Sequence, residues 1–186
     1  MVYRARHTAH RAQTPEEKVG LAIHVTMSSI AKCWREHQAN HVVVALEGRS
    51  WRKDHYAPYK RNRSDARAAA TPAQQAEDQM FWQTYDELQT WLDEKTNCSV
   101  VKIERAEADD IIARWIALHP QDEHVIISSD TDFVQLVAQN VKQYNGITDE
   151  LITIEGIFDA KGKPVIDKKS KEPKTIPNPQ WLLFEK

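Results

Sequence analysis

The run His41-Val42-Val43-Val44-Ala45-Leu46 constrains the fold of this chain most, because successive residues in it are apolar, and not only alternate ones. A strand of this kind is typical of a parallel sheet, in which both faces of each strand are covered. Further strand-like runs lie at residues 99–103, 124–127 and 141–144. Segments with helical spacing of apolar residues separate these runs, and the alternation predicts an α/β fold with a mostly parallel sheet flanked by helices.

The helices are predicted from start signals and apolar spacing. Thr14-Pro15 followed by Glu16-Glu17 is typical of a helix start, with a capping side chain, a proline in the first turn and acids behind it. Asp159-Ala160-Lys161-Gly162-Lys163 indicates the turn of a β-hairpin near the C-terminus. Helices are predicted over residues 14–37, 73–94, 109–118, 131–138 and 180–186.

Acidic residues follow the predicted strands. Glu47 comes directly after the first run, and acidic groups at 107–110 and 130–132 follow the next two. The carboxyl ends of parallel strands lie at one edge of a sheet, where open α/β sheets bind ligands. Like charges that meet there repel one another unless a cation joins them, and hard oxygen ligands suit Mg²⁺ or Mn²⁺. The three groups together favour a metal site.

Each acidic group also has a purely structural explanation. Acids in the first turn of a helix interact favourably with the helix dipole, whatever the function of the protein. An Asp-x-Asp sequence after a strand can form a turn or cap a helix. Taken singly, each group is more often structural, so the metal hypothesis depends on their recurrence at successive strand ends.

A basic segment interleaved with aromatic residues follows Glu47. Basic side chains neutralise phosphates, and planar rings stack on unpaired bases, so the segment predicts binding of single-stranded nucleic acid. The alternative is a solvated run of charges beside a turn at Pro58. The residues predicted to bind nucleic acid are Arg49, Trp51, Arg52, Lys53, Tyr59, Lys60, Arg61, Arg63 and Arg67.

Composition limits the remaining classes. The net charge is −2, so nucleic-acid binding has to come from such local patches. No apolar run approaches membrane-spanning length, and the basic N-terminus lacks the apolar core of a signal peptide. Cys33 and Cys98 form neither a disulfide framework nor a zinc motif, so a reducing cytoplasm is the expected compartment.

Three motifs resemble those of the flap endonuclease and 5′–3′ exonuclease family, especially its phage branch that includes T4-type ribonuclease H. They are Leu46-Glu47-Gly48-Arg49-Ser50-Trp51-Arg52 with Tyr59-Lys60-Arg61-Asn62-Arg63 behind it, Ala106-Glu107-Ala108-Asp109-Asp110-Ile111-Ile112-Ala113, and Ser128-Ser129-Asp130-Thr131-Asp132-Phe133. The resemblance implies a PIN-like nuclease domain over residues 1–176, with a helical arch at about 51–75. Residues 177–186 would begin a helix-hairpin DNA-binding region that the chain does not complete.

The resemblance also implies a mechanism and a substrate. Two Mg²⁺ ions, for which Mn²⁺ can substitute, would activate water and stabilise the leaving oxygen in phosphodiester hydrolysis. The substrate would be DNA with 5′ single-stranded ends or flaps, with an RNA–DNA hybrid as a second candidate, in phage-type replication or repair. The compartment would be the cytoplasm of a bacterium or of a phage-infected host.

The motifs assign roles to individual residues. Lys60 and Arg63 match basic residues that contact the scissile phosphate, and Tyr59 matches a ring that stacks on a terminal base. Glu47 stands where the family usually has aspartate. The metal-site carboxylates would be Glu47, Glu107, Asp109, Asp110, Asp130 and Asp132, and the catalytic residues Lys60, Arg63, Glu107, Asp109, Asp130 and Asp132.

Two further departures from the family pattern leave alternatives open. Family members begin with a strand that ends in an aspartate, and this chain starts after it; the family also continues past Lys186. An inactive or weak DNA-binding remnant, or one half of a split nuclease, is therefore the alternative. In the split version a partner polypeptide would supply the strand or the helix-hairpin, and the run 42–46 would otherwise expose an unpaired edge. A PIN-type toxin ribonuclease fits less well, because such proteins lack the basic arch.

Overall fold

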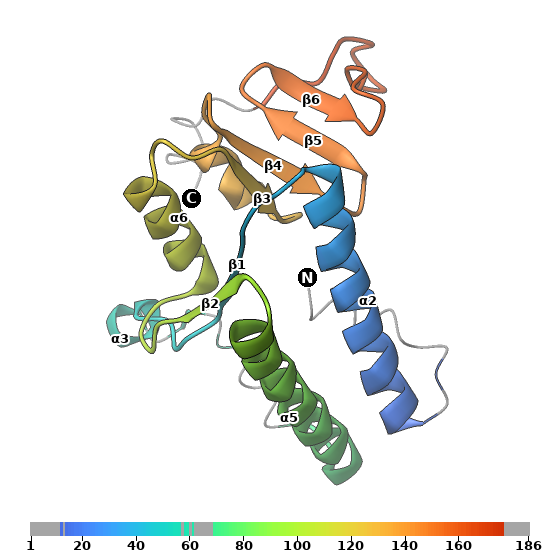
Figure 1. Ribbon diagram of the computed structural model, residues 1–186, viewed down its shortest axis with the longest axis vertical. Coiled ribbons are helices and arrows are strands. Elements are labelled where there is room, and N and C mark those ends of the chain that lie inside the picture. Colours follow the sequence, from blue (N-terminus) through green and yellow to red (C-terminus); the bar gives the residue numbers. More distant parts are fainter. Residues whose placement is uncertain (1–11, 13, 57, 60, 62–68, 177–186) are drawn as a thin grey trace. The chain divides into compact units, whose positions relative to one another are not determined.

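The structure is a computed structural model that describes residues 12, 14–56, 58–59, 61 and 69–176 (Figure 1). The chain divides into two compact units, Met1–Ile111 and Ile112–Lys186. The helix predicted over 180–186 lies outside the described residues, as do Lys60, Arg63 and Arg67.

Two long helices pack against each other in the first unit. Helices α2 (Pro15–Glu36) and α5 (Pro72–Lys95) each begin with a proline behind a threonine cap. Both caps are complete capping boxes, in which the threonine and the side chain three residues later satisfy each other's backbone N–H groups. Buried Val19, Ala22 and Phe81 form the core between the helices. Both helices confirm the prediction, with ends that differ from it by one residue.

The first unit also contains a pair of parallel strands. Strand β1 (Val42–Leu46) pairs with β2 (Cys98–Lys102) in a register that places Val44 opposite Val100. The strand predicted at 99–103 therefore starts one residue earlier. Within the described residues β1 pairs with β2 alone, and its first four residues are only half-buried. The short helix α3 (Arg52–His55) follows β1 and buries none of its residues.

Helix α6 (Ala108–Leu118) leads out of the first unit into the second. In the second unit, strand β3 (His124–Ile127) pairs in parallel with β4 (Val141–Asn145). The segment predicted as a helix at 131–138 forms the 3₁₀ helix η2 (Thr131–Leu136). A core of Ile126, Phe133 and Val141 packs against Ile112 and Ile116 of α6.

An antiparallel hairpin completes this sheet. Strand β5 (Glu150–Thr153) pairs with β4, and β6 (Gly156–Asp159) pairs with β5. The predicted turn at 159–163 is present, since the Asp159 side chain accepts hydrogen bonds from the N–H groups of Lys161 and Lys163. The hairpin starts one strand earlier than predicted, because Ile154-Glu155 also reverse the chain.

The strand pairing is less uniform than predicted. The described strands form two sheets, β1-β2 and β3-β4-β5-β6, with two parallel pairings and two antiparallel ones. The strands that follow helical segments pair in parallel, as predicted, and the departure comes from the C-terminal hairpin. Among the described residues, no helix is both long and apolar enough to cross a membrane.

Candidate metal and nucleic-acid site

A close backbone approach joins the loop after β1 to the loop before α6. The N–H of Gly48 donates to the carbonyl of Ala106 at 2.9 Å, and the N–H of Arg49 donates to that of Glu104 at 2.8 Å. A carboxylate oxygen of Glu47 accepts from the N–H of Ala108 at 2.9 Å. Acidic groups that are sixty residues apart in the sequence therefore occupy adjacent loops, as the strand-end pattern predicted for this unit.

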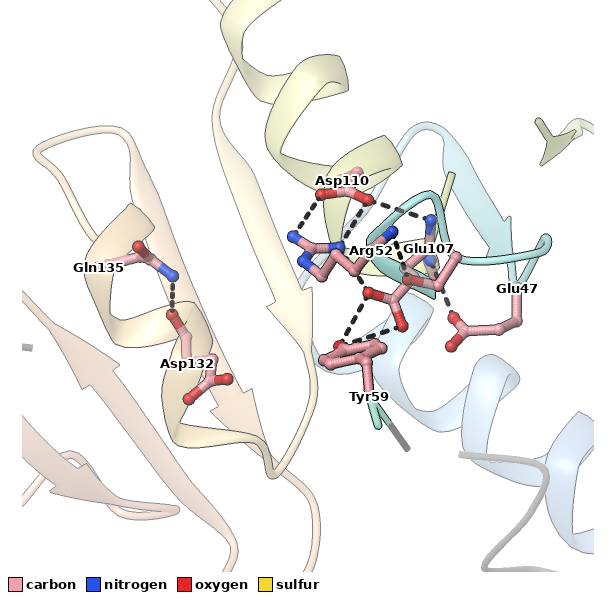
Figure 2. A network of polar contacts seen from close by, with 9 residues as sticks. Glu47, Arg52, Tyr59, Glu107, Asp110, Asp132 and Gln135 are labelled. Carbon is pink, nitrogen blue, oxygen red and sulfur yellow. Dashed lines mark hydrogen bonds and ion pairs between the residues drawn. The ribbon is translucent and has the colours of Figure 1, made fainter. Parts of the chain in front are cut away.

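Arg52 lies between two of the predicted metal ligands, Glu107 and Asp110 (Figure 2). Its Nη1 donates to Glu107 Oε2 at 2.5 Å and to Asp110 Oδ2 at 3.1 Å, and its Nη2 donates to Asp110 Oδ1 at 3.0 Å. The guanidinium carbon also lies 4.9 Å from the centroid of the Trp51 ring, within the range of a cation–π interaction. Arg52, predicted to bind nucleic acid, is thus engaged with carboxylates in this structure.

Glu107 is the most deeply placed acid of the group. Only 3% of its surface is exposed, and a buried carboxylate is stable only when it is paired and hydrogen-bonded. Arg52 provides the charge, and the hydroxyl of Tyr59 donates to Glu107 Oε2 at 3.0 Å (Figure 2). Tyr59 is predicted to stack on a base, and here its hydroxyl is anchored to the acidic loop.

These contacts change the acidity of Asp110. The hydrogen bond from Arg52 holds the pKa of the Asp110 carboxyl below its ordinary value, and the N–H of Glu107 adds to this effect. The same bond raises the pKa of Arg52, which is charged at every accessible pH. Both residues therefore favour the ionised pair.

The Asp110 pair should make unfolding pH-dependent. Because the folded pKa lies below the unfolded value, the pair stabilises the fold above about pH 3.9, the ordinary aspartate value, and the contribution disappears as the pH falls through the folded pKa. Urea unfolding of wild type and Asp110→Asn without added metal tests this. We expect the variant to be less stable at pH 7 and the difference to shrink in acid. A difference that stays constant with pH would contradict it.

The remaining predicted acids lie in the second unit, apart from exposed Asp109. Asp130 Oδ1 accepts from the N–H of Asp132 at 3.0 Å, so Asp130 caps η2. This is the structural explanation that the sequence left open. The hydrogen bond occupies one carboxylate oxygen of exposed Asp130, and a capping aspartate can still bind a metal through its other oxygen. The backbone carbonyl of Asp132 accepts from Gln135 at 2.8 Å (Figure 2).

Gln143 holds the loop that carries Asp130, and sequence reasoning missed it. Only 1% of this residue is exposed, and its Nε2 donates to the carbonyls of Ser128 at 3.0 Å and of Asp130 at 2.7 Å. Its Oε1 is buried without a hydrogen-bond partner among the described residues. The available signal was a polar residue at position 143 of the strand-like run 141–144, where a central parallel strand is covered.

Replacing Gln143 with leucine should destabilise the second unit. The two carbonyls lose their buried donor, which typically costs about 1–3 kcal/mol, while the lost Oε1 offsets part of that. Gln135→Leu is the matched control, because its amide also donates to a backbone carbonyl, that of Asp132 in η2, but is exposed. Urea denaturation should show a clear loss for Gln143→Leu alone. Equal effects of both variants would remove Gln143 from this role.

The carboxylate oxygens of the predicted ligands suit a hard cation. In the described residues, however, these carboxylates do not come together as a metal site. Among residues 12, 14–56, 58–59, 61 and 69–176, no group of three or more His, Cys, Asp or Glu side chains could hold a metal ion. Glu107 and Asp110 are instead bridged by Arg52. The convergence of both acidic groups on one metal site stays a prediction.

The described part of the basic segment is largely exposed. Arg49 and Arg105 both pair with Asp54, at 2.5 and 2.7 Å, with 69% and 70% of their side chains exposed. Trp51 is 42% exposed, and Lys53 and Arg61 also lie at the surface. Nucleic-acid binding by this segment stays a prediction, and its remaining members, Lys60, Arg63 and Arg67, lie outside the described residues.

Comparisons with known proteins agree with these observations. The family model of the 5′–3′ exonuclease N-terminal resolvase-like domain matches residues 1–163. A flap endonuclease Xni from Shewanella woodyi is 34% identical over 154 residues, which are 78% of this chain and 54% of that protein. The chain spans about half the length of the curated relatives it matches.

Solved structures of bacteriophage T5 proteins share the fold. The T5 5′-exonuclease with bound zinc ions has a TM-score of 0.64 at 20% identity, over 82% of this chain and 54% of that one. The T5 D15 flap endonuclease variant in a complex with DNA and metal ions has a TM-score of 0.62 at 20% identity, over 83% and 54%. These likenesses confirm the predicted PIN-like α/β fold.

Proposed function

We propose, from the premise that this chain belongs to the 5′–3′ exonuclease family, that it carries out metal-dependent hydrolysis of phosphodiester bonds in DNA. The bound metal would supply Lewis-acid stabilisation of the phosphate and a nucleophilic water. Its ligands would be Glu47, Glu107, Asp109 and Asp110, with Asp130 and Asp132 from the second unit. Mg²⁺ is the proposed ion, in two sites, with Mn²⁺ as a substitute.

The substrate we propose is DNA with a 5′ single-stranded end or flap. Relatives of this chain are named flap endonucleases, and the T5 D15 structure contains DNA. An RNA–DNA hybrid is a second substrate of the same chemistry. Exposed Arg49, Lys53 and Arg61 would neutralise backbone phosphates, and Trp51 and Tyr59 would face unpaired bases. The cytoplasm of a bacterial or phage-infected cell is the compartment in which we expect such a substrate.

The observation that carries this proposal is the joining of the two acidic loops beside the basic segment. Backbone contacts of Gly48 and Arg49 bring Glu47 to the start of α6, and Arg52 links the basic segment to Glu107 and Asp110. A carboxylate group for metals next to cationic side chains for phosphates is the arrangement that metal-dependent phosphodiester hydrolysis needs.

Cleavage of a 5′-labelled flap duplex by the purified chain tests the proposal. We expect cleavage in Mg²⁺ and in Mn²⁺ and none in EDTA. The labelled products should come from the 5′ end of the flap strand. Salt-sensitive binding to the flap without cleavage in either metal would reject the nuclease and support a DNA-binding remnant. The bridging of Glu107 and Asp110 by Arg52 is the observation that favours this second candidate.

A partner polypeptide belongs to the same proposal. Strand β1 is a run of apolar residues, only half-buried in four of its five positions, and among the described strands it pairs with β2 alone. Such an edge accepts a further strand. A polypeptide that supplies it should co-purify with the chain and raise its melting temperature. If hydrogen exchange of the chain alone shows that the backbone amides on both edges of β1 are protected, no such partner is needed.

A further inference from the structure

The guanidinium of Arg52 takes the position of a cation in the carboxylate group of the first unit. It makes three hydrogen bonds to two acids, of which Glu107 has 4% and Asp110 has 30% of its side chain exposed (Figure 2). Such bonds between charged partners are strong and directional. Without Arg52, the two carboxylates would meet near a buried position without the charge that this guanidinium supplies.

The oxygens that Arg52 uses are those that a metal would need. Glu107 Oε2 and both carboxylate oxygens of Asp110 accept from the guanidinium, and Asp110 Oδ2 also accepts from the N–H of Glu107. A lone pair directed at an N–H group is not available to a metal ion, and two cations at one site repel each other. Guanidinium and metal are therefore alternatives at these oxygens.

We propose that Arg52 is the exchangeable counter-ion of this site: it holds Glu107 and Asp110 while metal is absent, and a divalent cation displaces it on binding. This inference rests on the proposed function, since it takes these acids as metal ligands. It assigns Arg52 a positioning and regulatory role that differs from simple phosphate binding. The acids stay in their binding positions because a built-in cation keeps them there.

The surroundings of Arg52 allow such an exchange. Helix α3 is a single turn with no buried residue, so movement of the side chain or of the turn disrupts no core packing. The Arg52 side chain is 34% exposed, and its aromatic neighbour Trp51 is exposed as well. A displaced guanidinium would join Arg49 and Lys53 among the surface cations. By linkage, phosphates that bind the released Arg52 would increase metal affinity, and metal would increase DNA affinity to the same extent.

Direct Mn²⁺ binding, measured by calorimetry on the full chain without DNA, tests the exchange. We expect Arg52→Gln to bind Mn²⁺ more tightly than wild type by about tenfold, because the charge-assisted hydrogen bonds that compete for these oxygens are lost. Arg52→Lys keeps the charge but loses the fork that bridges both acids, so its affinity should lie between the two. Arg105→Gln removes the same charge from an exposed residue that pairs with Asp54, and it should bind Mn²⁺ like wild type.

A double variant locates the effect. Adding Asp110→Asn to Arg52→Gln should abolish the gain in affinity, because position 110 then offers no anionic oxygen and Glu107 alone of the two acids remains. If Arg52→Gln fails to fold, the comparison of Arg52→Lys with wild type decides the question. Mn²⁺ affinity that is unchanged or weaker in the folded Arg52 variants, or no Mn²⁺ binding by any of them, would overturn the exchange.

The outcomes separate this inference from the proposed function. If Arg52 variants bind Mn²⁺ more tightly but the chain cleaves no flap substrate, the proposed nuclease activity is rejected and the exchange stands. If the chain cleaves flap DNA but substitution of Arg52 leaves its Mn²⁺ affinity unchanged, the proposed nuclease activity stands and the exchange is rejected.

Discussion

Asp130→Asn should abolish metal-dependent cleavage of a flap substrate while leaving the second unit folded. Asparagine caps helices as well as aspartate does, so the contact from Asp130 to the N–H of Asp132 at the start of η2 survives the change. What disappears is the negative charge of an exposed carboxylate, and with it a proposed ligand of the metal. Metal stabilisation contributes several kcal/mol to such reactions, so the expected loss in rate is at least about 100-fold.

This substitution separates the two explanations of the Asp-x-Asp sequence. If Asp130 serves only as a cap, asparagine should preserve both stability and cleavage. If it holds a metal, stability and DNA binding should stay close to wild type while the rate falls. Flap cleavage in Mn²⁺, DNA binding and urea denaturation, measured on one preparation, distinguish these cases. Glu123→Gln removes a charge from another exposed acid of the same unit, whose distance to Lys142 is 3.9 Å, and should change none of them.

The regular elements were predictable from the sequence because their signals are local. Thr14 and Thr71 cap helices through contacts three residues away, and a run such as Val42–Leu46 needs only its own residues to indicate a parallel strand. The C-terminal hairpin was placed less well. Residues 159–163 carry an obvious turn sequence, whereas the tighter reversal at Ile154-Glu155 carries none. Local patterns therefore locate strands better than they locate the turns between them.

The sequence predicts which acidic residues belong to the candidate site, but not which side chains contact one another there. The acids follow strand ends, so their grouping within the first unit follows from chain direction alone. That Arg52 contacts Glu107 and Asp110, across more than fifty residues, depends on how two loops meet, which no periodicity encodes. The same holds for Gln143 and the Asp130 loop, where one buried amide satisfies two distant carbonyls. In both cases the pairing depends on backbone geometry that only the structure shows.

Gly48→Ala should strongly destabilise the first unit. A Cβ at this position would lie 2.1 Å from the carbonyl oxygen of Ile103, 2.6 Å from that of Ala106 and 2.9 Å from that of Glu104. All three are backbone atoms, so no side chain can move aside, and the loops themselves have to separate. Separation breaks the bonds from Gly48 and Arg49 that join the two acidic loops. We expect a loss of about 3 kcal/mol or more, at or above the upper end of typical overpacking, or failure to fold.

Gly20→Ala is the matched control, because the same methyl group is added in the same unit with the opposite expected sign. Gly20 is an exposed residue within α2, and a Cβ there would meet nothing within 4 Å. Alanine in a helix interior is favoured over glycine by about 0.5–1 kcal/mol, so this variant should be more stable than wild type. Urea denaturation of both variants gives the comparison. A Gly48→Ala protein as stable as wild type would mean that the loops can part freely, and the placement of Glu47 beside α6 would then lose its structural basis.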